Sequence, residues 1–76
     1  MYQYSSTALN NLGAIYLELD NNADAKTCLL RAVEIDPENS GALMNLANAL
    51  VETGDISEAS QCLLQCFELK KKKKSL

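Results

Sequence analysis

Three cysteines are the side chains of this chain best suited to metal or redox chemistry. Cys62 and Cys66 stand four positions apart, a spacing at which one helix could present two thiolates to a metal ion. The chain contains no histidine, so a zinc site would have too few ligands. We therefore interpret Cys28, Cys62 and Cys66 as small residues of an apolar core, and their odd number favours a reducing compartment.

Acid–base catalysis has equally little to build on. Without histidine, no side chain of the chain ordinarily ionises near neutral pH, and the three glycines are too scattered for a phosphate-binding loop. Glu18 and Glu52 could in principle pair, but two carboxylates on an open, solvated face do not form an acid–base dyad. We predict that the chain is not an enzyme and binds no cofactor and no metal.

An internal repeat supplies the elements that position these residues. Residues 6–37 match residues 40–71 at 11 of 32 positions, which indicates stacked copies of one supersecondary unit. Apolar residues recur at three- and four-residue steps, and strict alternation is absent, so each copy is predicted to be a helical hairpin. The predicted fold class is all-α, with four antiparallel helices near residues 6–19, 23–36, 40–53 and 57–72.

Capping and turn residues support these helix limits. Ser5 and Asn39 each precede an apolar periodic segment and can accept a hydrogen bond from an otherwise unpaired N–H group. Gly54 can adopt the positive φ that ends a helix, whereas Asp20 at the equivalent place adopts it at some cost. Pro37 lacks a backbone N–H and should end the second helix.

The first copy has a recognisable pattern of small and large residues. Its members are Leu9, Leu12, Gly13, Tyr16, Ala25, Leu29, Ala32 and Pro37. This spacing resembles the tetratricopeptide repeat, although Leu9 stands where tryptophan is usual and Lys71 where the second copy would have proline. The resemblance implies an α-solenoid fragment of two tandem repeats, 5–38 and 39–72. The last helix should run into the lysines, with residues 73–76 as a frayed tail.

The family also implies a binding surface, because the first helix of each repeat lines a concave groove. The residues that this places in a peptide-binding groove are Asn10, Asn11, Glu18, Met44, Asn45, Asn48 and Glu52. Neither first helix contains lysine or arginine, so a carboxylate-gripping clamp is excluded. Asn11 and Asn45 resemble the asparagine ladder of the repeat domain of O-linked N-acetylglucosamine transferase, in which carboxamides would pair with peptide backbone. The alternative is that both amides bond only locally or to water.

Charge is divided unevenly along the chain. Residues 1–69 hold ten acids against Lys26 and Arg31, a net charge of −8, and the lysines at 70–74 bring it to −3. The acidic body argues against nucleic-acid binding, and no apolar run is long enough to cross a membrane. We expect a cytoplasmic protein. The lysine run (Lys70 to Lys74) is also compatible with nuclear import, contact with an anionic membrane or acidic partner, or a solvated helix end.

Protein–protein interaction is the function that the resemblance implies. Two repeats leave one end of the stack uncovered, so Leu63, Phe67 and Leu69 should be exposed and should drive homo-oligomer formation. Two alternatives remain open. The chain could be the substrate-recruiting segment of a larger enzyme such as a glycosyltransferase, or a self-associating structural or engineered repeat piece. We expect a part of a larger repeat array.

Overall fold

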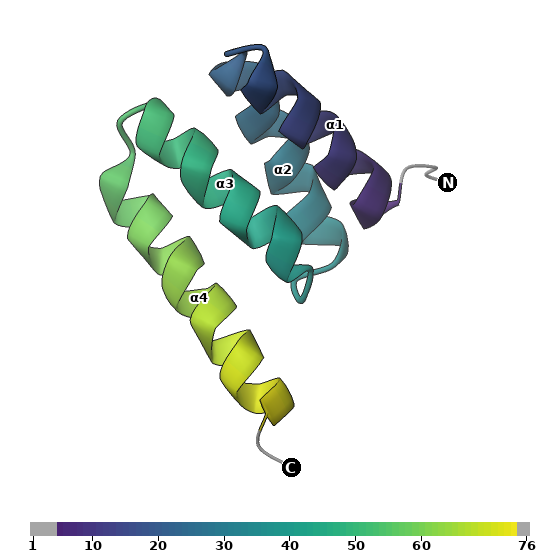
Figure 1. Cartoon of the computed structure of the whole chain (residues 1–76), viewed down its shortest axis with the longest axis vertical. Helices are drawn as coiled ribbons and strands as arrows, with labels where there is room; N and C mark the ends of the chain where they lie inside the picture. The colour runs from purple at the N-terminus through teal and green to yellow at the C-terminus, as the bar shows by residue number, and fades with distance from the viewer. Residues whose placement is uncertain (1–4, 75–76) are drawn as a thin grey trace.

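Four α-helices make up the protein, whose computed structural model describes residues 5–74. They are α1 (Ser6–Glu18), α2 (Asn22–Ile35), α3 (Ser40–Glu52) and α4 (Ile56–Lys74). α1 pairs with α2 and α3 pairs with α4, and contacts of α3 with α2 and α1 join the two hairpins. Figure 1 shows α1 and α4 at opposite ends of the row, with α3 between them. The predicted all-α fold of two tandem hairpins is confirmed.

The predicted caps begin the first helix of each hairpin. The Ser5 hydroxyl and the Asn39 side-chain oxygen each accept a hydrogen bond from the backbone N–H three residues further on, at 3.0 and 3.1 Å. The two hairpin turns also follow the sequence, since φ is 61° at Asp20 and 90° at Gly54. An aspartate in this left-handed region costs roughly 1–2 kcal/mol that glycine avoids. Turn chemistry therefore sets where each hairpin reverses.

Small residues bring the helices close together. Ala25, Ala32, Ala42 and Ala49 are completely buried, and the core clusters join residues from all four helices. Leu29 of α2 is also completely buried, and it lies directly over the buried Gly13 of α1. Because alanine and glycine add little bulk, the larger leucines of neighbouring helices fill the spaces between them. The core is thus a set of large side chains set against small ones.

The last helix is longer than predicted. α4 continues to Lys74, two residues past the expected end and into the segment predicted to be a frayed tail, while residues 75–76 lie outside the described part. Lys71 stands where Pro37 stops α2, and lysine is a good helix former that complements the dipole at a helix C-terminus. Within residues 5–74, no helix is both long and apolar enough to span a membrane.

Candidate binding face of α1 and α3

The first helices of the two hairpins, α1 and α3, lie against each other and share one face. At their contact, the side-chain nitrogen Nδ2 of Asn45 donates a hydrogen bond to Oδ1 of Asn10 over 2.8 Å. Both residues are half-buried. We call Asn10 and Asn45 the carboxamide pair.

The carboxamide pair has unused hydrogen-bonding capacity. Within residues 5–74, no group bonds to Nδ2 of Asn10 or to Oδ1 of Asn45. Every fully buried polar side-chain atom in that part of the chain has a partner, so both unbonded atoms are at least partly exposed to solvent. A carboxamide nitrogen donates and a carboxamide oxygen accepts. The pair therefore presents one donor and one acceptor close together, and the backbone C=O and N–H of one residue in an extended chain, which point to the same side, can satisfy both.

Gly41 gives the Asn10 amide room to lie against α3. A methyl group added at Gly41 would sit 3.2 Å from Nδ2 of Asn10. This separation is tighter than ordinary van der Waals contact, so a larger side chain at position 41 would push the amide aside. The sequence gives no sign of this role, because Gly41 and Asn10 are far apart in the chain.

Ser6 fixes the position of α1 relative to α2 and α3. Its hydroxyl donates to the backbone oxygen of Ala32 and accepts from Nδ2 of Asn39, both over 2.8 Å. Since Asn39 also caps α3, one buried hydroxyl links the start of α1, the end of α2 and the start of α3. Such a network rigidifies the contact at which Asn10 and Asn45 meet. The sequence shows Ser6 and Asn39 near the predicted helix starts but gives no sign that their side chains meet.

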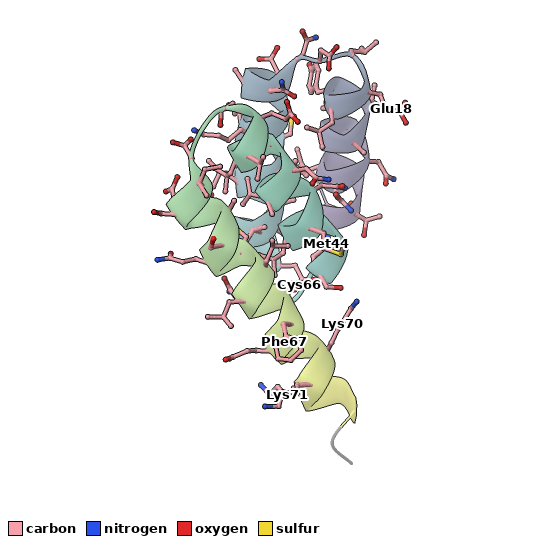
Figure 2. The ribbon with its side chains drawn as sticks, turned by 60° about the vertical axis from the view of Figure 1, so that its left-hand side comes forward. Glu18, Met44, Cys66, Phe67, Lys70 and Lys71 are labelled. Carbon is pink, nitrogen blue, oxygen red and sulfur yellow. The ribbon has the colours of Figure 1, made fainter. Side chains whose placement is uncertain are left out.

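The other predicted groove residues do not join the pair. Asn11 is exposed, and its side chain has no hydrogen-bond partner within residues 5–74. Asn45 faces α1, so its repeat equivalent Asn11 occupies the side of α1 turned away from α3. The remaining predicted residues, Glu18, Met44, Asn48 and Glu52, are exposed, and Figure 2 shows Glu18 projecting outward from the end of α1.

Comparison with known families agrees with the fold of two helical hairpins. A tetratricopeptide repeat family model matches residues 4–72. The chain belongs to the tetratricopeptide repeat family. Repeats of this family generally mediate protein–protein interaction, while a search of curated proteins finds no match to the chain.

An ion pair joins the two tetratricopeptide repeats on another side. Nζ of Lys26 on α2 lies 2.9 Å from Oδ2 of Asp55, which precedes α4, and both side chains are about one-third exposed. This hydrogen bond and the charge of Asp55 raise the pKa of Lys26. The same two interactions with Lys26, aided by the Thr53 hydroxyl, lower the pKa of Asp55. The contact steadies the repeat junction but lies away from the carboxamide pair.

The three cysteines sit in the second helices of the repeats. Cys28 and Cys62 are half-buried free thiols, and burial raises the pKa of each. Cys66 is buried, with its Sγ 3.8 Å from the backbone oxygen of Ser40. The raised pKa values of Cys28 and Cys62 reduce their thiolate fraction at neutral pH, so these two thiols are unsuited to nucleophilic chemistry. No cluster of three possible metal ligands occurs in the described part of the chain.

The residues predicted for self-association divide between two faces of α4. Leu63 and Phe67 are exposed, four residues apart and so on one side of the helix. Leu69 is half-buried and lines a shallow hollow with Gln65 and Lys71. Two residues correspond to about 200° around an α-helix, so Leu69 does not share the face of Phe67.

Proposed function

We propose that the face shared by α1 and α3 binds an extended polypeptide, with the carboxamide pair hydrogen-bonding to the backbone N–H and C=O of one residue of the ligand. The observation that carries this proposal is the accessible donor of Asn10 beside the accessible acceptor of Asn45. A backbone N–H can bond to the oxygen of Asn45, and a backbone C=O can accept from Asn10. Recognition of this kind is independent of ligand side chains, as in the asparagine ladder that the sequence resembles.

Charge adds a preference to this backbone contact. The only charged residues of α1 and α3 are Glu18 and Glu52, both exposed. Acidic ligand side chains would meet like charge there, whereas neutral and basic ones would not. We therefore propose neutral or basic extended segments of a partner protein as the ligands. The role that we propose is non-catalytic. The three free thiols of the protein suit a reducing compartment such as the cytoplasm or nucleus.

A peptide selected from a random displayed library against the whole chain provides the probe for this proposal. Its affinity is measured by calorimetry for the parent, Asn10→Ala, Asn45→Ala and the control Asn11→Ala. Loss of one hydrogen bond costs about 1 kcal/mol, so each pair variant should weaken binding roughly fivefold, while the control should bind as the parent does. Circular dichroism verifies that all variants stay folded.

An ester scan of the same peptide tests whether the backbone is read. Replacing one peptide N–H by an ester oxygen removes a single donor without changing a side chain. For the parent protein, the ester should lower the affinity at one position of the peptide. For Asn45→Ala, which has lost the acceptor, an ester at the same position should leave the affinity unchanged. Parent-like affinity in both pair variants would refute the proposal, and losses in Asn11→Ala and Asn45→Ala alone would favour a ladder without Asn10.

A further inference from the structure

The outer helices α1 and α4 each expose an apolar face. The equivalent faces of α3 and α2 are covered, because those two helices pack against each other inside the molecule. We propose that the free face of α4 docks on the free face of α1 in a second copy of the chain, in the arrangement that α2 and α3 adopt within one copy. α4 is the repeat equivalent of α2, and α1 is the equivalent of α3. Every contact between α2 and α3 therefore identifies a counterpart residue, 34 positions away, at each end.

On α4, the uncovered position is Leu63. Its counterpart Leu29 lies against Gly13 of α1 and shares a core cluster with residues of α3, so it is 0% exposed, whereas Leu63 is 50% exposed. The next residue behaves differently, since Leu30 remains exposed even beside α3, as does its counterpart Leu64. α3 covers one line of side chains on α2 and leaves the adjacent line open. The same distinction on α4 singles out Leu63 as the side chain that awaits a partner.

On α1, the matching positions are Leu12 and Ile15. Leu12 is 41% exposed, whereas its counterpart Leu46 on α3 is 3% exposed within the core cluster that also holds Leu29. Ile15 is likewise exposed, although its counterpart Ala49 is completely buried in that cluster. α1 thus presents to solvent the apolar side that α3 presents to α2. A face shaped to receive a helix like α4 is present on the same molecule.

The larger side chains of the end faces set the spacing of this contact. Ile15 replaces Ala49, and Phe67 replaces Val33, so α4 and α1 cannot approach as closely as α2 and α3 do. Helices pack at separations of about 8–10 Å according to the side chains between them, and this range accommodates the added bulk. Figure 2 shows Phe67 on the part of α4 that extends past α3, where a second copy can reach it.

Charge complementarity favours a second copy in this orientation. In the α2–α3 arrangement the end of α2 lies beside the start of α3, so the end of α4 would lie beside the start of α1. Lys70 and Lys71 are exposed near that end of α4. The start of α1 is bonded through Ser6 to Asn39, next to the exposed acids Asp36 and Glu38 of the α2–α3 turn. The lysines of one copy thereby approach acidic side chains of the other.

Sedimentation equilibrium over a hundredfold concentration range tests the association. The parent should form dimers and longer species, because a head-to-tail contact leaves one free face at each end of the assembly. Leu63→Glu should raise the dissociation constant by roughly tenfold or more, whereas the neighbouring control Leu64→Glu should leave it within about twofold. A compact monomer throughout would overturn the second copy as occupant and leave the faces to another protein. Equal changes of the dissociation constant in Leu63→Glu and Leu64→Glu would overturn the assignment of the Leu63 face of α4 as the contact surface.

Mixing two blocked variants tests the head-to-tail polarity. Leu63→Glu lacks a working α4 face and Ile15→Glu lacks a working α1 face, so each alone should be monomeric. An equimolar mixture should form a one-to-one dimer, because the first supplies an intact α1 face and the second an intact α4 face. Self-association of Ile15→Glu alone, or no dimer in the mixture, would overturn the proposal. Both sites are solvent-exposed, and circular dichroism verifies the fold of each variant.

Discussion

Replacing Gly13 by alanine should destabilise the protein, although the same change usually stabilises a helix. Gly13 is buried in the middle of α1, directly beneath Leu29 of α2. A methyl group at Gly13 would lie 2.5 Å from Cγ and 2.7 Å from Cδ2 of Leu29. Those atoms belong to a side chain that is completely buried, so they cannot move aside into solvent.

Two opposing effects set the expected magnitude. Alanine in a helix interior is favoured over glycine by roughly 1 kcal/mol. Overpacking a filled core costs roughly 1–3 kcal/mol, and the upper part of that range applies here because both Cγ and Cδ2 of Leu29 would have to shift. The net effect of Gly13→Ala should be a loss of about 1–2 kcal/mol in the free energy of unfolding. A loss of 1 kcal/mol in a domain of this size lowers Tm by roughly 4–8 °C.

Urea and thermal unfolding followed by circular dichroism measure this loss against a matched control. In Gly41→Ala the added methyl would lie 3.2 Å from Nδ2 of Asn10 and 3.6 Å, an ordinary contact distance, from Oδ1 of Asn39, and the end of the half-buried Asn10 side chain can shift by the few tenths of an ångström required. Gly41→Ala should therefore leave stability unchanged or raise it by up to about 1 kcal/mol. A Gly13→Ala protein as stable as the parent, or more stable, would refute the close approach of α1 to Leu29.

Two further predictions concern the contacts that join the repeats. Ser6→Ala should lower the free energy of unfolding by roughly 1–3 kcal/mol in a urea titration, because it leaves the buried partners of the Ser6 hydroxyl unpaired. The control Ser40→Ala should be nearly neutral, because the Ser40 hydroxyl of the parent has no partner within residues 5–74. The Lys26–Asp55 pair should stabilise the protein above the ordinary carboxyl pKa of 3.8, since the folded pKa of Asp55 is lower, and this contribution should vanish as pH falls through the folded value. The same contribution should vanish in strong alkali, as pH rises through the raised pKa of Lys26. Plots of Tm against pH for the parent and Lys26→Met should therefore converge at both extremes of pH, and parallel plots would contradict the pairing.

Local chemistry explains why the fold was predictable. The helix starts at Ser6 and Ser40 follow from the caps before them, and Asp20 and Gly54 end helices where a left-handed residue was expected. These interactions span only a few residues, so the chain order contains all the information needed. The predicted length of α4 was two residues too short at its C-terminal end, because the helix propensity of lysine and the helix dipole extend the helix to Lys74, beyond the repeat pattern.

The candidate site was predictable only in part. Comparison of the two repeats aligned Asn11 with Asn45, but the structure places Asn10 beside Asn45. Equivalent residues of stacked repeats point in the same direction, so they lie in series and need not touch. The residues that touch come from opposite sides of neighbouring helices and occupy different repeat positions, which self-alignment cannot reveal.

The sequence by itself determined the four helices, their turns and membership of the tetratricopeptide repeat family, because periodicity, caps and small residues act locally or recur at a fixed interval. Only the tertiary structure decided which side chains meet across that interval. Three side-chain contacts depend on the rotation and spacing of the packed helices: those of Ser6 with Asn39, Lys26 with Asp55 and Asn45 with Asn10. The same packing leaves Leu63 exposed while its identical counterpart Leu29 is buried, since burial is a property of neighbours and not of residue type.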